Sequence, residues 1–158
     1  MKTQVRKGVG FGLTSGVITT LGLMVGLNSG THSKMVVLGG ILTIAIADAF
    51  SDALGIHISE ETENVHTPAQ IWTATFATFF AKLFFALLFI IPVLLLSLQT
   101  AVLASIAWGL SILGLLSYRM AKEQNEKPHK VIAEHLLIAI TVIVLTNFIG
   151  KWISAIFV

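Results

Sequence analysis

Three ionisable residues lie inside otherwise apolar stretches of the sequence: Asp48, Asp52 and Lys82. Asp48 and Asp52 stand four residues apart in "IADAFSDALGIH", residues 46–57, so a helix would place both carboxylates on one face. A charge at the centre of a bilayer costs at least ~2.5–3.5 kcal/mol, so each group must face the protein interior or water. Such groups often mark the path of an ion or a proton, and paired carboxylates suit a hard divalent cation.

Lys82 leaves two interpretations open. It can form a buried ion pair with Asp48 that only locks two helices together, although such a pair does not need Asp52. Alternatively, Lys82 holds both carboxylates when the site is empty, and loses its proton or swings away when a cation enters. The sequence therefore predicts a transport path through Ser15, Asp48, Asp52 and Lys82, in which Asp48 and Asp52 are the metal ligands.

The composition points to a membrane protein. The mean hydropathy is +0.88, and 55% of the residues are hydrophobic whereas only 11% are charged. A soluble domain of 158 residues cannot bury that much apolar surface. The chain has no cysteine, which excludes disulfides and thiolate chemistry, and a net charge of +2 does not favour a nucleic-acid partner. We find no zinc-protease, phosphate-loop or nucleophile–histidine motif and expect no enzyme activity and no permanently bound cofactor.

Five apolar segments are each about long enough to cross a ~30 Å hydrocarbon core. We predict an all-α membrane protein, a single domain over residues 1–158, with Pro92 as a possible kink in the third segment. The predicted spans are residues 5–27, 35–57, 71–98, 100–121 and 131–157.

The basic residues predict the orientation, because cytoplasmic loops carry an excess of Lys and Arg. With the N-terminus in the cytoplasm, only Lys34 and Lys151 lie near the opposite side. The cytoplasmic side then holds Lys2, Arg6, Lys7, Arg119, Lys122, Lys127 and Lys130. We therefore expect a cytoplasmic N-terminus and a multi-pass protein in the cell membrane of a prokaryote, or in an organelle membrane of a eukaryote.

The helix rise predicts which polar groups share a level. Measured from the cytoplasmic ends, Ser15 lies ~15 Å deep, Asp48 ~13 Å and Lys82 ~16 Å. Asp52 lies one turn closer to the cytoplasm, at ~7 Å. On the cytoplasmic side, His57, Glu60, Glu61 and Glu63 either capture cations at the mouth of the path or form a solvated helix end.

Gly8, Gly12 and Gly16 stand four residues apart on the first segment. Small residues at this interval let another backbone approach closely. The stripe is either ordinary helix packing inside the protein or the seam of a homodimer, and both alternatives require the first helix to be packed against protein.

Two stretches resemble the first two helices of the vacuolar iron transporter family: "GFGLTSGVITTLGLMVGL" and "ADAFSDALGIHIS". The first helix of that family typically reads G-L-N-D-G-x-x-T-T. A looser similarity extends to Pro92 and to "NFIGKWI" near the C-terminus. The resemblance implies five spanning helices, a homodimer, and export of Fe²⁺ or Mn²⁺ from the cytoplasm in exchange for protons.

The sequence departs from the family at the positions that would bind metal. Ser15 stands where the family has an aspartate in its first helix. Asp52 stands where the family has a methionine in its second helix, and Ile56 stands where the family has an acidic residue after a glycine. Lys82 has no counterpart, and the cytoplasmic metal-binding insertion between the second and third helices is missing.

The preferred interpretation is a secondary transporter that exports Fe²⁺ or Mn²⁺, with membrane lipid, the metal ion, protons and a second copy of the chain as partners. In the alternative, Lys82 permanently occupies the cation site and the same fold moves protons, a monovalent ion or another solute. A third possibility is a membrane scaffold that transports nothing.

Overall fold

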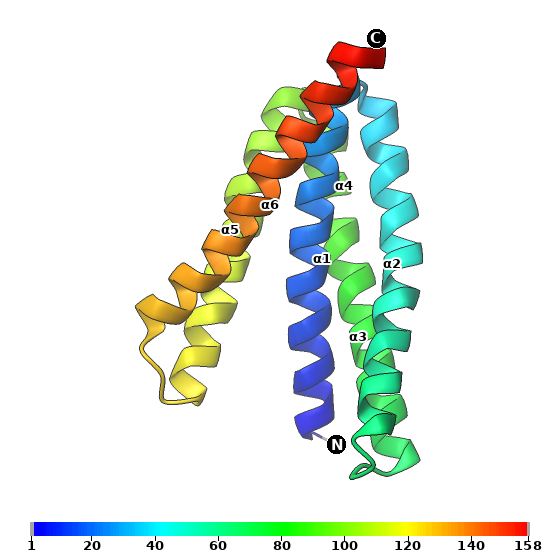
Figure 1. The fold of residues 1–158 in the computed structure, drawn as a ribbon, viewed down its shortest axis with the longest axis vertical. Coiled ribbons are helices and arrows are strands. Elements are labelled where there is room, and N and C mark those ends of the chain that lie inside the picture. Colours follow the sequence, from blue (N-terminus) through cyan, green and yellow to red (C-terminus); the bar gives the residue numbers. More distant parts are fainter. Residues whose placement is uncertain (1, 158) are drawn as a thin grey trace. The chain divides into compact units, whose positions relative to one another are not determined.

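The computed structural model describes residues 2–157, and every regular element in that range is a helix (Figure 1). In chain order the helices are α1 (Lys2–Thr31), α2 (Lys34–Thr62), α3 (Pro68–Leu88), α4 (Ile90–Leu95), α5 (Leu98–Glu123) and α6 (Pro128–Phe157). Five candidate spans are long and apolar enough to cross a membrane, the third being α3 and α4 together. The prediction of an all-α chain with five such spans is confirmed, and the chain is compatible with an integral multi-pass membrane protein.

The helices extend beyond the apolar segments that predicted them. α1 starts at Lys2 rather than at residue 5, and α2 continues past His57 to Thr62. Hydropathy marks only the part of a helix that would lie in hydrocarbon, whereas backbone hydrogen bonding continues through the polar turns at its ends. α2 then stops where Asn64 adopts a left-handed backbone with φ of 53°, a conformation that asparagine tolerates well.

The third span is interrupted at Phe89, three residues before Pro92. A proline inside a helix has no N–H for the carbonyl four residues earlier and its ring crowds that carbonyl, which here belongs to Leu88. The Phe89 N–H therefore bonds the carbonyl of Ala86 in a tighter turn, at 3.2 Å. Pro92 itself lies within the short helix α4, so the interruption precedes the proline.

The chain contacts define two compact units, and α1 and α2 contribute to both. Unit 1 contains α1 up to Thr20, α2 from Ile41 onward and α3. Unit 2 contains the remaining parts of α1 and α2 together with α4, α5 and α6.

Unit 1 is held together by small residues that let its helices approach closely. α2 buries Ala45, Ala49 and Ala53 at four-residue intervals. α1 places Gly8 and Gly12 against the backbone of α3, so that a Cβ added at Gly12 would lie 2.5 Å from the Thr78 carbonyl oxygen.

Gly16 continues the same contact with α3, beside the backbone of Lys82. All three glycines of the predicted stripe thus pack within one chain, and a second protomer would have to use another surface.

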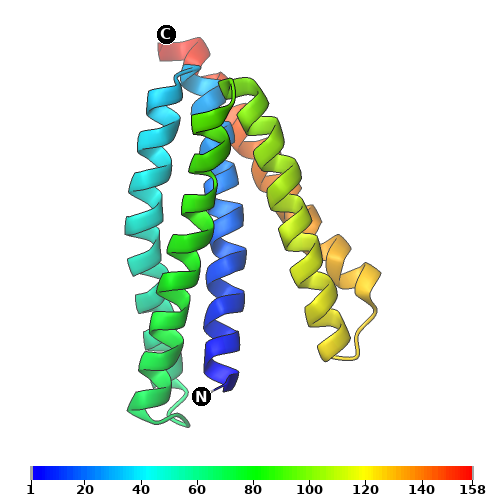
Figure 2. The same ribbon diagram turned by 180° about the vertical axis from the view of Figure 1, so that it is seen from behind.

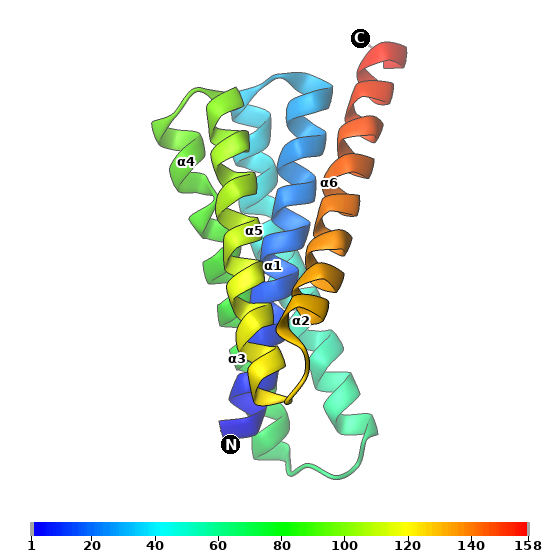
Figure 3. The same cartoon turned by 90° about the vertical axis from the view of Figure 1, so that its left-hand side faces the viewer.

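Unit 2 uses the same kind of packing between the second half of α1 and α6. Gly150 of α6 faces the backbone of Gly26 and Gly30, where a side chain would not fit. Ser29 donates a hydrogen bond of 2.6 Å to Oδ1 of Asn147 across the same contact. Residues 96–97 form the turn between α4 and α5 (Figure 2), and residues 124–127 join α5 to α6, which pack together (Figure 3).

The Gly12 contact predicts the effect of a single methyl group. Gly12→Ala should lower the free energy of unfolding by about 1–3 kcal/mol, because α1 and α3 must separate to admit the Cβ. Gly10→Ala is the matched control on the same helix, because a Cβ at Gly10 meets no atom within 4 Å. Thermal unfolding of the two purified variants in detergent, followed by circular dichroism, measures the difference. Equal midpoints would show that the α1–α3 contact does not limit stability.

Candidate functional site

The intramembrane charges of unit 1 meet at one point between three helices. α2 carries Asp48 and Asp52 on the face that also buries its alanines, and the close approach of α1 to α3 brings Ser15 beside Lys82. The helix-rise estimate placed Ser15, Asp48 and Lys82 at one level and Asp52 one turn away, and the structure brings all four together around Lys82. We call Ser15, Asp48, Asp52 and Lys82 the inner cluster.

The Lys82 ammonium is the centre of the inner cluster. Its Nζ donates hydrogen bonds to Oδ2 of Asp52 at 2.7 Å and to Oγ of Ser15 at 2.6 Å. It also forms an ion pair with Oδ2 of Asp48 at 2.5 Å. An ammonium group has three N–H bonds, and two of them are used in the hydrogen bonds to Asp52 and Ser15, whereas the contact with Asp48 is an ion pair.

Burial differs between the positive and negative groups of the inner cluster. The Lys82 side chain is 1% exposed, whereas those of Asp48 and Asp52 are 26% and 17% exposed. With every group ionised the cluster carries one net negative charge, which attracts a further cation. The two carboxylates and the Ser15 hydroxyl offer the oxygen ligands that a hard divalent cation prefers, but the ammonium already holds the position between them.

The residues predicted at the cytoplasmic mouth do not form one group. His57 hydrogen-bonds through Nδ1 to the Thr75 hydroxyl at 3.0 Å and packs edge-on against Trp72. Glu61 is exposed. His57 and Glu61 lie one turn apart on α2 and share a face of the helix, but the His57 side chain contacts α3 and not Glu61.

Glu60 and Glu63 join a second charged group at the ends of the helices of unit 1. Lys7 of α1 forms ion pairs with Glu60 and, at 3.2 Å, with Glu63. His66, in the loop before α3, lies 3.0 Å from Oε2 of Glu60, whose side chain is fully buried. We call Lys7, Glu60, Glu63 and His66 the terminal cluster.

The terminal cluster combines residues from separate segments of the sequence, which no single motif links. In the sequence, Lys7 indicated only the orientation of the chain, although it lies near the predicted cytoplasmic end of its helix, as Glu60 does. Three ligand atoms lie within 4.8 Å of one another, one each from Glu60, Glu63 and His66, which is close enough to bind a cation. The Lys7 ammonium already pairs with both carboxylates.

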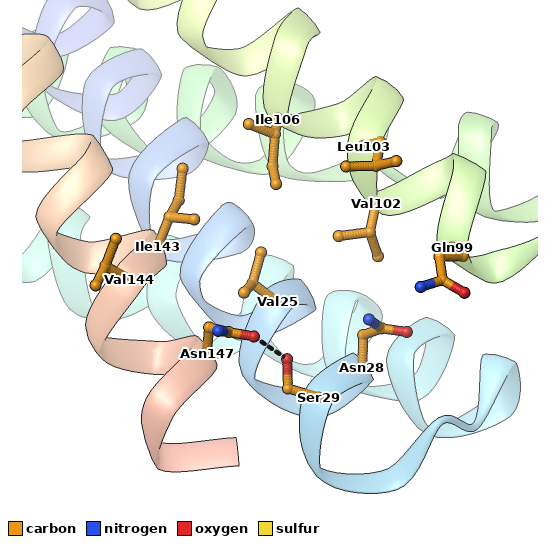
Figure 4. A pocket seen from close by; sticks show the side chains of 10 residues that line it. All are labelled: Val25, Asn28, Ser29, Gln99, Val102, Leu103, Ile106, Ile143, Val144 and Asn147. Carbon is orange, nitrogen blue, oxygen red and sulfur yellow. Dashed lines mark hydrogen bonds between the residues drawn. The ribbon is translucent and has the colours of Figure 1, made fainter. Parts of the chain in front are cut away.

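Unit 2 contains a pocket of about 260 Å³ between α1, α5 and α6 (Figure 4). Its polar groups carry no charge: they are the amides of Asn28, Gln99 and Asn147 and the hydroxyl of Ser29. The apolar wall is formed by Val25, Val102, Leu103, Ile106, Ile143 and Val144. A pocket without a carboxylate or an imidazole is poorly suited to a metal cation.

No protein-family model and no curated protein matches the sequence. The resemblance to vacuolar iron transporters therefore rests on the motifs in α1 and α2 quoted above.

The geometry of the inner cluster predicts how the protein responds to loss of its ammonium. Lys82→Met should reduce the free energy of unfolding by about 3–5 kcal/mol, because two carboxylates then face each other without a buried counter-ion. Adding Asp48→Asn and Asp52→Asn should recover most of that loss, because the amides remove the repulsion. Chemical unfolding of the single and triple variants at the same pH measures both changes. Equal losses in the two variants would mean that Lys82 contributes packing and not charge.

Proposed function

We propose that the chain is a secondary transporter that exports a divalent metal cation, Fe²⁺ or Mn²⁺, from the cytoplasm in exchange for protons. The observation that carries this proposal is the contact of the Lys82 ammonium with Asp48, Asp52 and Ser15 inside apolar helices. The cluster resembles a cation-binding site in which the bound cation is the ammonium group of the protein's own Lys82. The choice of Fe²⁺ or Mn²⁺ comes from the resemblance of two stretches of the sequence to the first two helices of vacuolar iron transporters, although Ser15 and Asp52 depart from that family's pattern.

In the proposed mechanism, the tethered ammonium and the metal ion compete for the same carboxylates. When the metal binds to Asp48 and Asp52, Lys82 moves away and releases its proton to the side from which the metal came, because two cations cannot share the space between the carboxylates. When the metal leaves on the other side, Lys82 takes up a proton and returns. One carboxylate pair that binds either a metal or a protonated lysine thereby couples metal movement to proton movement in the opposite direction.

The orientation and assembly are part of the proposal. The excess of Lys and Arg near one set of helix ends supports a cytoplasmic N-terminus. The terminal cluster, which contains Lys7 and Glu60, then lies at the cytoplasmic side of the path. A homodimer is proposed from the family resemblance, with its seam elsewhere than on the glycine stripe of α1.

Asp52→Asn should abolish proton flux that depends on Mn²⁺ or Fe²⁺, because the amide removes a negative charge that the metal and the Lys82 ammonium bind in turn. The measurement uses proteoliposomes with a pH-sensitive dye inside and metal added outside. Glu61→Gln is the matched control, because it removes a carboxylate from an exposed position of the same helix. Metal-dependent flux that persists in Asp52→Asn would exclude this carboxylate from the mechanism.

A second candidate function is favoured by the close contacts of Lys82 with three residues. If the ammonium never leaves Asp48, Asp52 and Ser15, the same fold moves protons, a monovalent ion or another solute, or acts as a scaffold. Lys82→Met separates the candidates in the same proteoliposomes. Retained or increased metal uptake would support the metal transporter, whereas loss of a flux that needs no metal would support the second candidate.

A further inference from the structure

The two charged clusters of unit 1 lie along the same side of α2. Asp48, Asp52 and Glu60 occur at multiples of four residues, and Glu63 follows one turn later. This spacing keeps the side chains on neighbouring parts of one helix face. The position that would continue the series between Asp52 and Glu60 is Ile56.

Ile56 is the apolar member of this series of carboxylates. It is four residues from Asp52 and four from Glu60, which corresponds to about 6 Å along the helix in each direction. Its side chain is 8% exposed, and together with Ala53 it provides the only buried positions of α2 between Asp52 and Glu60. On α2, Ile56 is therefore the one bulky hydrocarbon side chain that is buried between the inner cluster and the terminal cluster.

The other side of unit 1 offers no route between the clusters. At Gly8 and Gly12 the backbones of α1 and α3 are so close that an added Cβ would lie 2.5 Å from a carbonyl oxygen. There is no space for a hydrated ion between two backbones in such contact. A path from the terminal cluster to the inner cluster that avoids the α1–α3 contact runs along α2, past Ile56.

We propose that Ile56 is the apolar barrier of the transport path, separating the Lys82 ion pairs from the Lys7 ion pairs. Charged groups attract a cation or a proton to each side of the barrier, but a hydrocarbon layer cannot replace the water that an ion must shed. A barrier of this kind keeps the inner cluster closed to the terminal side until the helices move. This inference rests on the proposed function and specifies where the closed path is blocked.

The barrier can be tested by chemical accessibility, because the chain contains no cysteine. A cysteine introduced by Ser15→Cys reports the inner cluster, since the Ser15 hydroxyl contacts Lys82 Nζ at 2.6 Å. Membrane vesicles carrying this variant are treated with a membrane-impermeant, positively charged methanethiosulfonate on the side of the terminal cluster. The rate of thiol modification is then compared between substitutions at Ile56.

Ile56→Thr and Ile56→Val form a matched pair, because they remove the same part of the side chain and differ by a hydroxyl in place of a methyl group. A hydroxyl in the barrier should admit water, so Ile56→Thr should raise the modification rate about tenfold over Ile56→Val. Leu54→Thr controls for position, because Leu54 is 59% exposed on the same helix and should leave the rate unchanged. Equal rates for the threonine and valine variants would overturn the barrier.

A second measurement decides the question if Ile56→Thr does not fold. Ile56→Cys in an otherwise native chain should react slowly with the same reagent, whereas Glu63→Cys in the terminal cluster should react fast. A fast reaction at position 56 would overturn the proposal.

Neither accessibility measurement requires transport. A chain that moves no cation but admits the reagent after Ile56→Thr would refute the proposed function and leave the barrier standing. Metal transport together with equal rates for threonine and valine would refute the barrier alone.

Discussion

The buried ammonium of Lys82 is the interaction on which unit 1 depends. Two carboxylates one turn apart on α2 repel each other, and neither can remain charged in an apolar surrounding without a positive partner. Lys82 contacts both of them and the Ser15 hydroxyl, at 2.5–2.7 Å. One side chain thereby links α3 to α2 and α1, and the three helices of the unit share a single electrostatic centre.

This arrangement requires helices that approach one another unusually closely. In a bilayer, apolar side chains gain little by leaving lipid for protein, so close packing and polar contacts must hold helices together. The alanines of α2 and the glycines of α1 supply the close packing in unit 1, and the Lys82 contacts supply the polar component. Larger residues at Gly12 or Ala49 would move Ser15 or Asp48 away from the ammonium, so the small residues position the site as well as stabilise the fold.

The two units differ in the polar groups that they use. Among residues 2–157, the ion pairs between side chains described above lie in unit 1, in the inner and terminal clusters. The hydrogen bonds between side chains of different helices in unit 2 include those of Ser29 with Asn147 and of Ser117 with His135, which contain no carboxylate. The Lys34 ammonium of this unit bonds the backbone carbonyls of Leu94 and Leu96. The pocket of this unit is lined by amides and hydrocarbon. The clusters of carboxylates described above therefore lie in unit 1.

The five spans and the level of the inner cluster could be predicted from the amino-acid sequence, because hydropathy and the helix rise are local properties of the chain. Counting residues along a straight helix gives the depth of each polar group below the helix end, and these depths grouped four residues: Asp48, Asp52, Ser15 and Lys82. Other contacts became known only from the folded chain: Lys82 contacts both aspartates, and Gly12 packs against α3. Lys7 pairs with Glu60, whereas His57 bonds Thr75. These pairings depend on the rotation of each helix about its axis and on the distance between axes. Contacts between residues remote in sequence set both quantities, so no count along a single segment could supply them.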